Sequence, residues 1–199
     1  MNNLPNLTVA ASIKSAKFSS LITILLLVIA NSGICQTIKG TYAIKNVQNG
    51  MLLRMQDANK KDGTALVAYS PVNWKCITWD FNKIEGNTYQ LRNLFTNKTF
   101  QPENMKPVNG TVLHQQPITL NQNNQLYEFI LIEKDVYLIK LKNTELYLSP
   151  ADPKGTVNSA IVVSEKKKGK EQWWTIYEQH PTMYNIQDWC MAILIQYFN

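Results

Sequence analysis

The sequence is poor in the residues that enzymes and metal proteins most often use for chemistry. Its 199 residues include three cysteines and two histidines. No cysteines have the short spacing of a zinc site, and there is no His-Glu-x-x-His motif, glycine-rich phosphate loop or nucleophile elbow. We therefore expect no catalytic residue, no metal site and no cofactor.

The sequence also lacks an apolar run long enough to span a bilayer. Residues 21–30 are apolar apart from one threonine, but a transmembrane helix needs about twenty such residues. Lysines without acidic residues precede this run, and the small residues Gly33 and Cys35 follow it, as in an export signal cleaved before Gln36. We predict a signal peptide at residues 1–35, secreted, periplasmic or cell-surface localisation, and no stable membrane span after cleavage. An uncleaved anchor and a lipid-modified Cys35 are the alternatives.

Charge and cysteine content limit the partners further. The net charge is +6, but the basic residues are scattered apart from the cluster at residues 166–170. We expect this cluster to be a solvated loop, and we expect no nucleic-acid partner. After cleavage, Cys76 and Cys190 either pair in an oxidising compartment or leave Cys76 as a small core residue.

What the sequence does contain is a pattern that recurs three times. The pattern Gln-x-aromatic-x-apolar has aromatic residues spaced by 48 and 47 positions: Trp79, Tyr127 and Trp174. Ile77 replaces the glutamine in the first copy. Other sets lie in the same register: Tyr42, Tyr89 and Tyr137; Ile44, Leu91 and Ile139; Leu53, Phe100 and Leu148; and turns at Asp62-Gly63, Asn109-Gly110 and Asn158-Ser159. These independent sets predict an internal repeat from about residue 41 to residue 178.

Each repeat contains four short stretches typical of strands, with turn residues between them. They are 41–46, 51–55, 64–69 and 78–84; 88–93, 98–101, 111–116 and 126–132; and 136–141, 146–149, 160–164 and 173–178. Three units are too few for a propeller. We predict a closed barrel built from two strands of each unit, with the other two strands forming hairpins that cap one end.

The Tyr-x-Ile start, the apolar residue eleven positions later, the Asp-Gly-Thr turn and the Gln-x-Trp close resemble the ricin B-type β-trefoil lectins. The resemblance covers about 140 residues. It implies an all-β fold, a β-trefoil of three four-stranded repeats with pseudo-threefold symmetry. We expect the domain to span residues 36–180. Residues 181–199 then form a C-terminal extension that packs on the barrel or offers a strip for a partner.

The resemblance also implies where a sugar would bind in each repeat. The first repeat keeps the aromatic residue, Tyr69, which we expect to be a lone contact. Where the resemblance implies an aspartate, a polar residue and an asparagine, this repeat instead has Arg54, Val67 and Cys76. The second repeat has polar residues that we expect to bind carbohydrate: Gln101, His114, Gln116, Asn124 and Gln125. The third repeat is the least suited and has these residues: Ser149, Val163, Glu165 and Glu171.

We predict an exported, non-catalytic, lectin-like module whose partner is a glycan or polysaccharide. The alternative is a trefoil that has lost sugar binding and serves as a protein-interaction or inhibitor scaffold. The absence of aspartate at positions 54, 101 and 149 favours the scaffold, and Asn124-Gln125 favours the lectin.

Overall fold

The computed structural model of the chain describes residues 37–182. The predicted export signal at residues 1–35, its cleavage before Gln36, Cys190 and most of the extension at residues 181–199 lie outside the described residues. Within the described range, no helix is long and apolar enough to cross a membrane.

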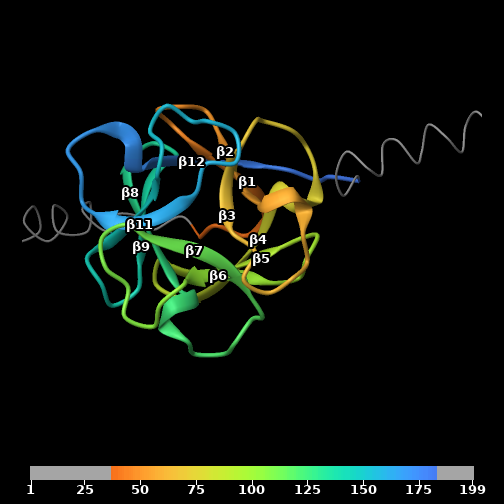
Figure 1. Cartoon of the computed structure of the whole chain (residues 1–199), viewed down its shortest axis with the longest axis horizontal. Helices are drawn as coiled ribbons and strands as arrows, with labels where there is room; N and C mark the ends of the chain where they lie inside the picture. Colours follow the sequence, from red (N-terminus) through yellow and green to blue (C-terminus); the bar gives the residue numbers. More distant parts are fainter. Residues whose placement is uncertain (1–36, 183–199) are drawn as a thin grey trace, which may run out of the picture. The chain divides into compact units, whose positions relative to one another are not determined.

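Twelve β-strands form the described part of the chain, four in each repeat (Figure 1). The first repeat has β1 (Gly40–Asn46), β2 (Leu52–Met55), β3 (Leu66–Tyr69) and β4 (Thr78–Glu85). The second has β5 (Thr88–Asn93), β6 (Thr99–Pro102), β7 (Thr111–Gln116) and β8 (Tyr127–Glu133). The third has β9 (Val136–Leu141), β10 (Leu146–Pro150), β11 (Ile161–Glu165) and β12 (Trp173–Glu178). The all-β prediction is confirmed, with strand ends within two residues of those expected.

Six of the strands close into a barrel. β1 pairs with β4 and β12, β5 pairs with β4 and β8, and β9 pairs with β8 and β12, all antiparallel. The remaining strands form the hairpins β2–β3, β6–β7 and β10–β11. This is the predicted division into barrel and hairpins, and the ring leaves none of its six strands with a free edge.

The barrel core is built from layers of equivalent residues. The three aromatic side chains of the recurring pattern are at most 1% exposed. Each donates a hydrogen bond to a carbonyl of the second strand of its own repeat: Trp79 to Leu53 (3.3 Å), Tyr127 to Phe100 (3.1 Å) and Trp174 to Leu148 (3.1 Å). Another layer is fully buried: Ile44, Leu91 and Ile139. Every repeat therefore contributes equivalent buried side chains to one core.

Four short 3-10 helices join the strands. They were not predicted from the sequence, because it shows no helical periodicity. They are η1 (Gln56–Ala58), η2 (Lys75–Ile77), η3 (Asn123–Gln125) and η4 (Lys170–Gln172). The last three occupy the same place in each repeat, directly before or one residue before the closing strand. A single turn of three residues is too short for an amphipathic pattern to show in the sequence.

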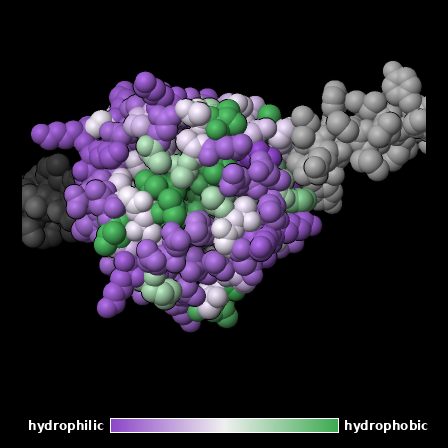
Figure 2. Space-filling view, viewed as in Figure 1, coloured by the Kyte–Doolittle hydropathy of each residue, from purple (hydrophilic) through white to green (hydrophobic). Residues whose placement is uncertain are grey.

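The hairpins meet around the pseudo-threefold axis through one repeated hydrogen bond. The turn before each third strand has a residue with positive φ, and its N–H donates to a carbonyl in the next repeat: Gly63 to Gln115, Gly110 to Val163 and Asn158 to Ala68. Figure 2 shows apolar side chains gathered at the centre of this face, where β3, β7 and β11 meet, surrounded by polar ones. The predicted equivalence of Ser159 to the two glycines is wrong by one residue, because Asn158 takes the left-handed conformation there.

Candidate functional site

Three of the predicted sugar contacts share the outer face of the hairpin β6–β7. Gln101 lies directly opposite His114, and Gln116 is two residues further along β7. Because side chains alternate along a strand, these three lie on the face opposite to the buried core residue Phe100. All three are half-buried. The structure therefore brings together residues that the resemblance placed in one site.

A hydrogen-bond network beneath this face leaves several polar groups open. The Oε1 of Gln101 accepts from Nε2 of Gln122 at 3.1 Å and from Nε2 of Gln125 at 2.8 Å. Within residues 37–182, no hydrogen bond uses the Nε2 of Gln101, the imidazole of His114 or the amide of Gln116. These groups remain available to pair with ligand hydroxyls.

Asn124 lies at the rim of the hairpin, in the middle of η3. Its Nδ2 donates to the carbonyl of Met105 at 3.2 Å, and no group of the described residues donates to its Oδ1. Met105 itself is 68% exposed. Asn124 therefore adds an open acceptor beside the polar face of β6–β7.

Gln125 has a different position from the other predicted contacts, because it is 1% exposed. Its Oε1 accepts from Nε2 of Gln90 at 3.1 Å and from the backbone N–H of Thr119 at 2.8 Å. Its Nε2 donates to Oε1 of Gln101 and, at 2.9 Å, to the carbonyl of Pro117. All of its hydrogen-bonding positions are thus used within the protein, and Gln125 supports the site from below.

In the first repeat, Tyr69 is not alone. The guanidinium carbon of Arg54 lies 4.0 Å from the centroid of the Tyr69 ring, and the ring of Trp74 lies 6.1 Å from the same centroid. A desolvated cation–π contact of this kind contributes about 2 kcal/mol. Arg54 is only 6% exposed although it carries a charge. The outer face of β2–β3 is therefore aromatic and cationic where that of β6–β7 is polar and neutral.

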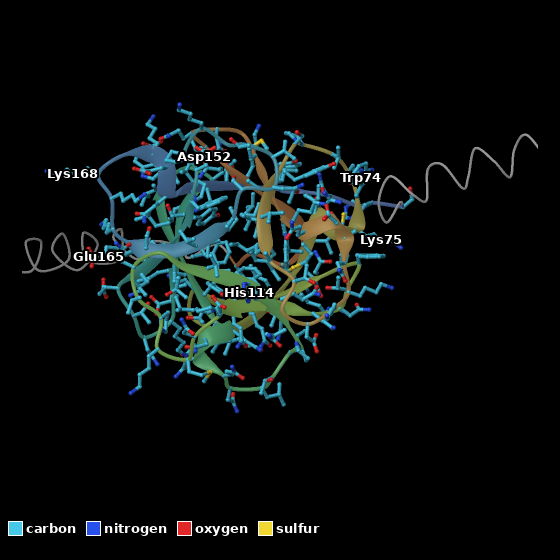
Figure 3. The ribbon with its side chains drawn as sticks, viewed as in Figure 1. Trp74, Lys75, His114, Asp152, Glu165 and Lys168 are labelled. Atoms are coloured by element: carbon cyan, nitrogen blue, oxygen red, sulfur yellow. The ribbon has the colours of Figure 1, made fainter. Side chains whose placement is uncertain are left out.

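Trp74 was missed by reasoning from the sequence, because it has no counterpart in the recurring pattern. The only signal was a second tryptophan in the segment that leads into Trp79. Figure 3 shows Trp74 and Lys75 well apart from His114, so the faces of the first and second repeats are separate surfaces.

In the third repeat, the residues assigned to the third strand have to be corrected. Ser149 pairs with Val162, as Arg54 pairs with Val67 in the first repeat. The equivalent outer-face residues are therefore Val162 and Ser164, and not Val163 and Glu165. The mistake followed from aligning the turn sequences, which placed β11 one residue out of register.

After this correction the third repeat offers little to a ligand. Ser149 is fully buried and Ser164 is 4% exposed. The Ser164 hydroxyl accepts a hydrogen bond from Nε2 of Gln172 at 2.9 Å. This repeat has no open polar set comparable to that of β6–β7.

Charged groups in the third repeat serve the local structure. The carboxylate of Asp152 accepts from the hydroxyl of Thr156 at 2.5 Å and from the backbone N–H of Lys154 at 2.9 Å. These hydrogen bonds hold the pKa of Asp152 below its ordinary value, and the one from the Thr156 hydroxyl has the largest effect. Across residues 37–182, no group of three His, Cys, Asp or Glu side chains is arranged to hold a metal ion.

Comparisons with known proteins agree with this architecture. A sequence model of the family described as "Ricin-type beta-trefoil lectin domain-like" matches residues 33–116. No curated protein sequence matches the chain. The designed threefold-symmetric protein ThreeFoil is 17% identical with a TM-score of 0.67, and the alignment covers 70% of this chain and 99% of ThreeFoil.

Two lectins of known structure are also similar. A ricin B-like lectin of Macrolepiota procera, in complex with lactose, is 22% identical with a TM-score of 0.61, and the alignment covers 73% of this chain and 99% of the lectin. The Polyporus squamosus lectin, bound to a human-type influenza-binding epitope, is 20% identical with a TM-score of 0.60, and the alignment covers 71% of this chain and 49% of that lectin. The threefold barrel and its three hairpins show that the chain folds as a β-trefoil, and residues 33–116 match the ricin-type, lectin-like family.

Proposed function

We propose that this domain is a non-catalytic carbohydrate-binding module, and that its principal site is the outer face of β6–β7. The observation that carries the proposal is the set of open polar groups on one hairpin: Gln101 Nε2, the His114 ring and the Gln116 amide, with Asn124 Oδ1 at the rim. Sugar hydroxyls are donors and acceptors at once, so amide and imidazole groups on one face suit them. The similarity to lectins, one of them in complex with lactose, supports the same class of ligand.

The site is expected to bind weakly. Its face carries no aromatic ring on which a pyranose could stack, and its polar side chains lose rotamer freedom when a ligand orders them. We expect dissociation constants of order micromolar to millimolar for a single site. We further propose that the export signal at residues 1–35 delivers the module outside the cytoplasm, where glycans and polysaccharides are its partners.

A glycan array on the protein beginning at Gln36 tests the proposal, followed by titration calorimetry with the best ligand. Gln116→Ala and Asn124→Ala should each weaken binding about fivefold, because each removes a hydrogen-bonding group worth about 1 kcal/mol. Glu171→Ala is the matched control, because Glu171 is the middle residue of η4 in the third repeat. It should bind like the unaltered protein.

Two results would contradict the assignment. If binding survives both substitutions, the sugar binds at another surface of the protein. An array without any glycan bound supports instead a protein-interaction or inhibitor scaffold, for which the loss of aspartate at positions 54, 101 and 149 is the favouring observation.

A further inference from the structure

The first repeat contains a buried cation without an opposite charge. Arg54 occupies the position on β2 that Gln101 has on β6 and Ser149 has on β10. Its side chain is 6% exposed, which is rare for arginine unless a carboxylate is close. Within residues 37–182, however, Arg54 forms no hydrogen bond and no ion pair, and its Nε is fully buried without a partner.

The surroundings of Arg54 do not supply the missing charge. Its guanidinium lies over the ring of Tyr69, and Tyr69 in turn packs against an apolar cluster that includes Leu52 and Ile77. Stacking on an aromatic ring offsets part of the desolvation of a cation, but it satisfies none of the guanidinium N–H donors. The buried Nε–H of Arg54 is therefore left without an acceptor, while the two terminal nitrogens of the guanidinium are not fully buried and can pair with an anionic group.

The position of the aromatic rings indicates what kind of molecule could bring this acceptor. Tyr69 and Trp74 lie beside each other, with ring centroids 6.1 Å apart and planes inclined by 39°. Both side chains are half-buried, so each has a surface that a ligand can reach. Rings of this kind pack against the apolar face of a sugar, while a guanidinium fork takes two oxygens of one anionic group.

We propose that the outer face of β2–β3 binds an acidic sugar, whose carboxylate or sulfate pairs with Arg54 while Tyr69 and Trp74 contact the sugar ring. The inference deepens the proposed function and rests on it. It assigns to the first repeat a ligand class that the second repeat does not select, because Gln101 is neutral and its Oε1 is already held by two glutamines.

The test uses titration calorimetry with three probes of equal length. Tetragalacturonate carries carboxylates, its methyl ester is the neutral counterpart, and a sulfated galactan tetrasaccharide carries the other anion. The protein should bind at least one anionic probe about tenfold more tightly than the methyl ester. Which of the two anions is preferred identifies the acidic group.

Two arginine variants separate a specific site from diffuse positive charge. Arg54→Met keeps the length and apolar stem of the side chain and should abolish the preference for the anionic probe. Arg92→Met removes the same charge from an exposed arginine that pairs with Asp80 at 2.7 Å, and it should retain the preference within about twofold. Equal losses in the two variants, or no preference in the unaltered protein, would overturn the proposal.

Thermal unfolding adds a readout that a purely structural arginine would not give. Without ligand, Arg54→Met should be at least as stable as the unaltered protein, because it removes an unpaired buried charge. Saturating anionic probe should raise the melting temperature of the unaltered protein and leave that of the variant unchanged. A melting temperature lowered by the substitution together with unchanged anion preference would show that Arg54 only supports the fold.

Arg54→Lys keeps the test decisive if the methionine variant does not fold. Lysine retains the charge but not the planar fork, so the preference should fall at least threefold, and an unchanged preference contradicts the proposal. The outcome is also separable from that of the β6–β7 site. Neutral glycans that bind through Gln116 without any anion preference refute only this inference, whereas a protein that binds neither kind of glycan refutes both proposals.

Discussion

Ile77 stands in the first repeat where the second and third repeats have Gln125 and Gln172. In the second repeat the amide of Gln125 receives a hydrogen bond from Gln90, and both side chains are buried. The residue equivalent to Gln90 in the first repeat is Ala43, which belongs with Ile77 to one apolar cluster. A polar pair has thus been replaced by an apolar pair, and either choice leaves no buried group unsatisfied.

Gln125→Ala tests the structural role of this glutamine. The substitution removes four hydrogen bonds of a buried amide. It leaves one N–H of the buried Gln90 amide and the Thr119 N–H without their acceptor, and the Gln101 Oε1 and the Pro117 carbonyl without one donor, so we expect a loss of about 3 kcal/mol in unfolding free energy. Urea denaturation measures it. Gln122→Ala, which removes one hydrogen bond at 3.1 Å from a half-buried residue, should lose less than about 1 kcal/mol. Similar losses for both would show that Gln125 is not a support.

At the scale of elements, the loop between β10 and β11 packs on the turn between β1 and β2. The side-chain amides of Gln48 and Asn49 donate to the carbonyl of Pro153 at 3.4 and 3.5 Å. Gly155 lies at the contact with a φ of 80°, and a Cβ there would come within 2.8 Å of the Asn49 Cβ and 2.9 Å of the Met51 side chain. The first and third repeats can meet here only because residue 155 has no side chain.

Gly155→Ala should therefore be more damaging than an alanine at another left-handed glycine. We expect a loss of about 3 kcal/mol, from backbone strain together with the clash against Asn49. Gly63→Ala is the matched control, because Gly63 has a φ of 81° and no atom within 4 Å of its would-be Cβ. It should lose only about 1 kcal/mol. Equal shifts in the urea midpoint would mean that the loop moves aside without loss.

The hairpins also show where the sequence allowed prediction and where it did not. Turn residues such as Asn109-Gly110 located the hairpins, because a left-handed backbone restricts the choice of residue. The third turn was placed one residue late, since Asn158 adopts that conformation without a following glycine. Trp74 and the stacking of Arg54 on Tyr69 could not be predicted, because they depend on contacts between a loop and a hairpin that follow no periodic pattern.

At the scale of the whole molecule, the fold was predictable because a threefold barrel imposes equal spacing on its units. Each core layer needs one residue from each repeat at one height, so the spacings of 47 and 48 residues recur in every layer. The binding faces escape this constraint because they lie outside the core. Their residues differ between repeats, so the repeat pattern does not reveal contacts such as that between Trp74 and Tyr69.

β12 completes the barrel, because it pairs with β9 on one side and with β1 on the other. A chain that ends at Gly169 lacks this strand and exposes the edges of both neighbours together with the apolar pocket of Trp174. We expect it to lose its cooperative unfolding transition and its near-ultraviolet circular dichroism.

A chain that ends at Thr182 retains β12 and is the matched control, for which we expect one cooperative transition. A cooperative transition in the shorter chain would mean that two repeats and part of the third are sufficient for a stable core.

The pairing of β1 with β12 places Tyr42 opposite Glu178, so the start and the end of the barrel lie side by side. A short linker can therefore join them, and new ends can be opened at the exposed turn around Gly86 between β4 and β5. A circularly permuted chain of this kind keeps every strand pair of the ring, so the order of the repeats along the polypeptide is a property of the gene and not of the fold.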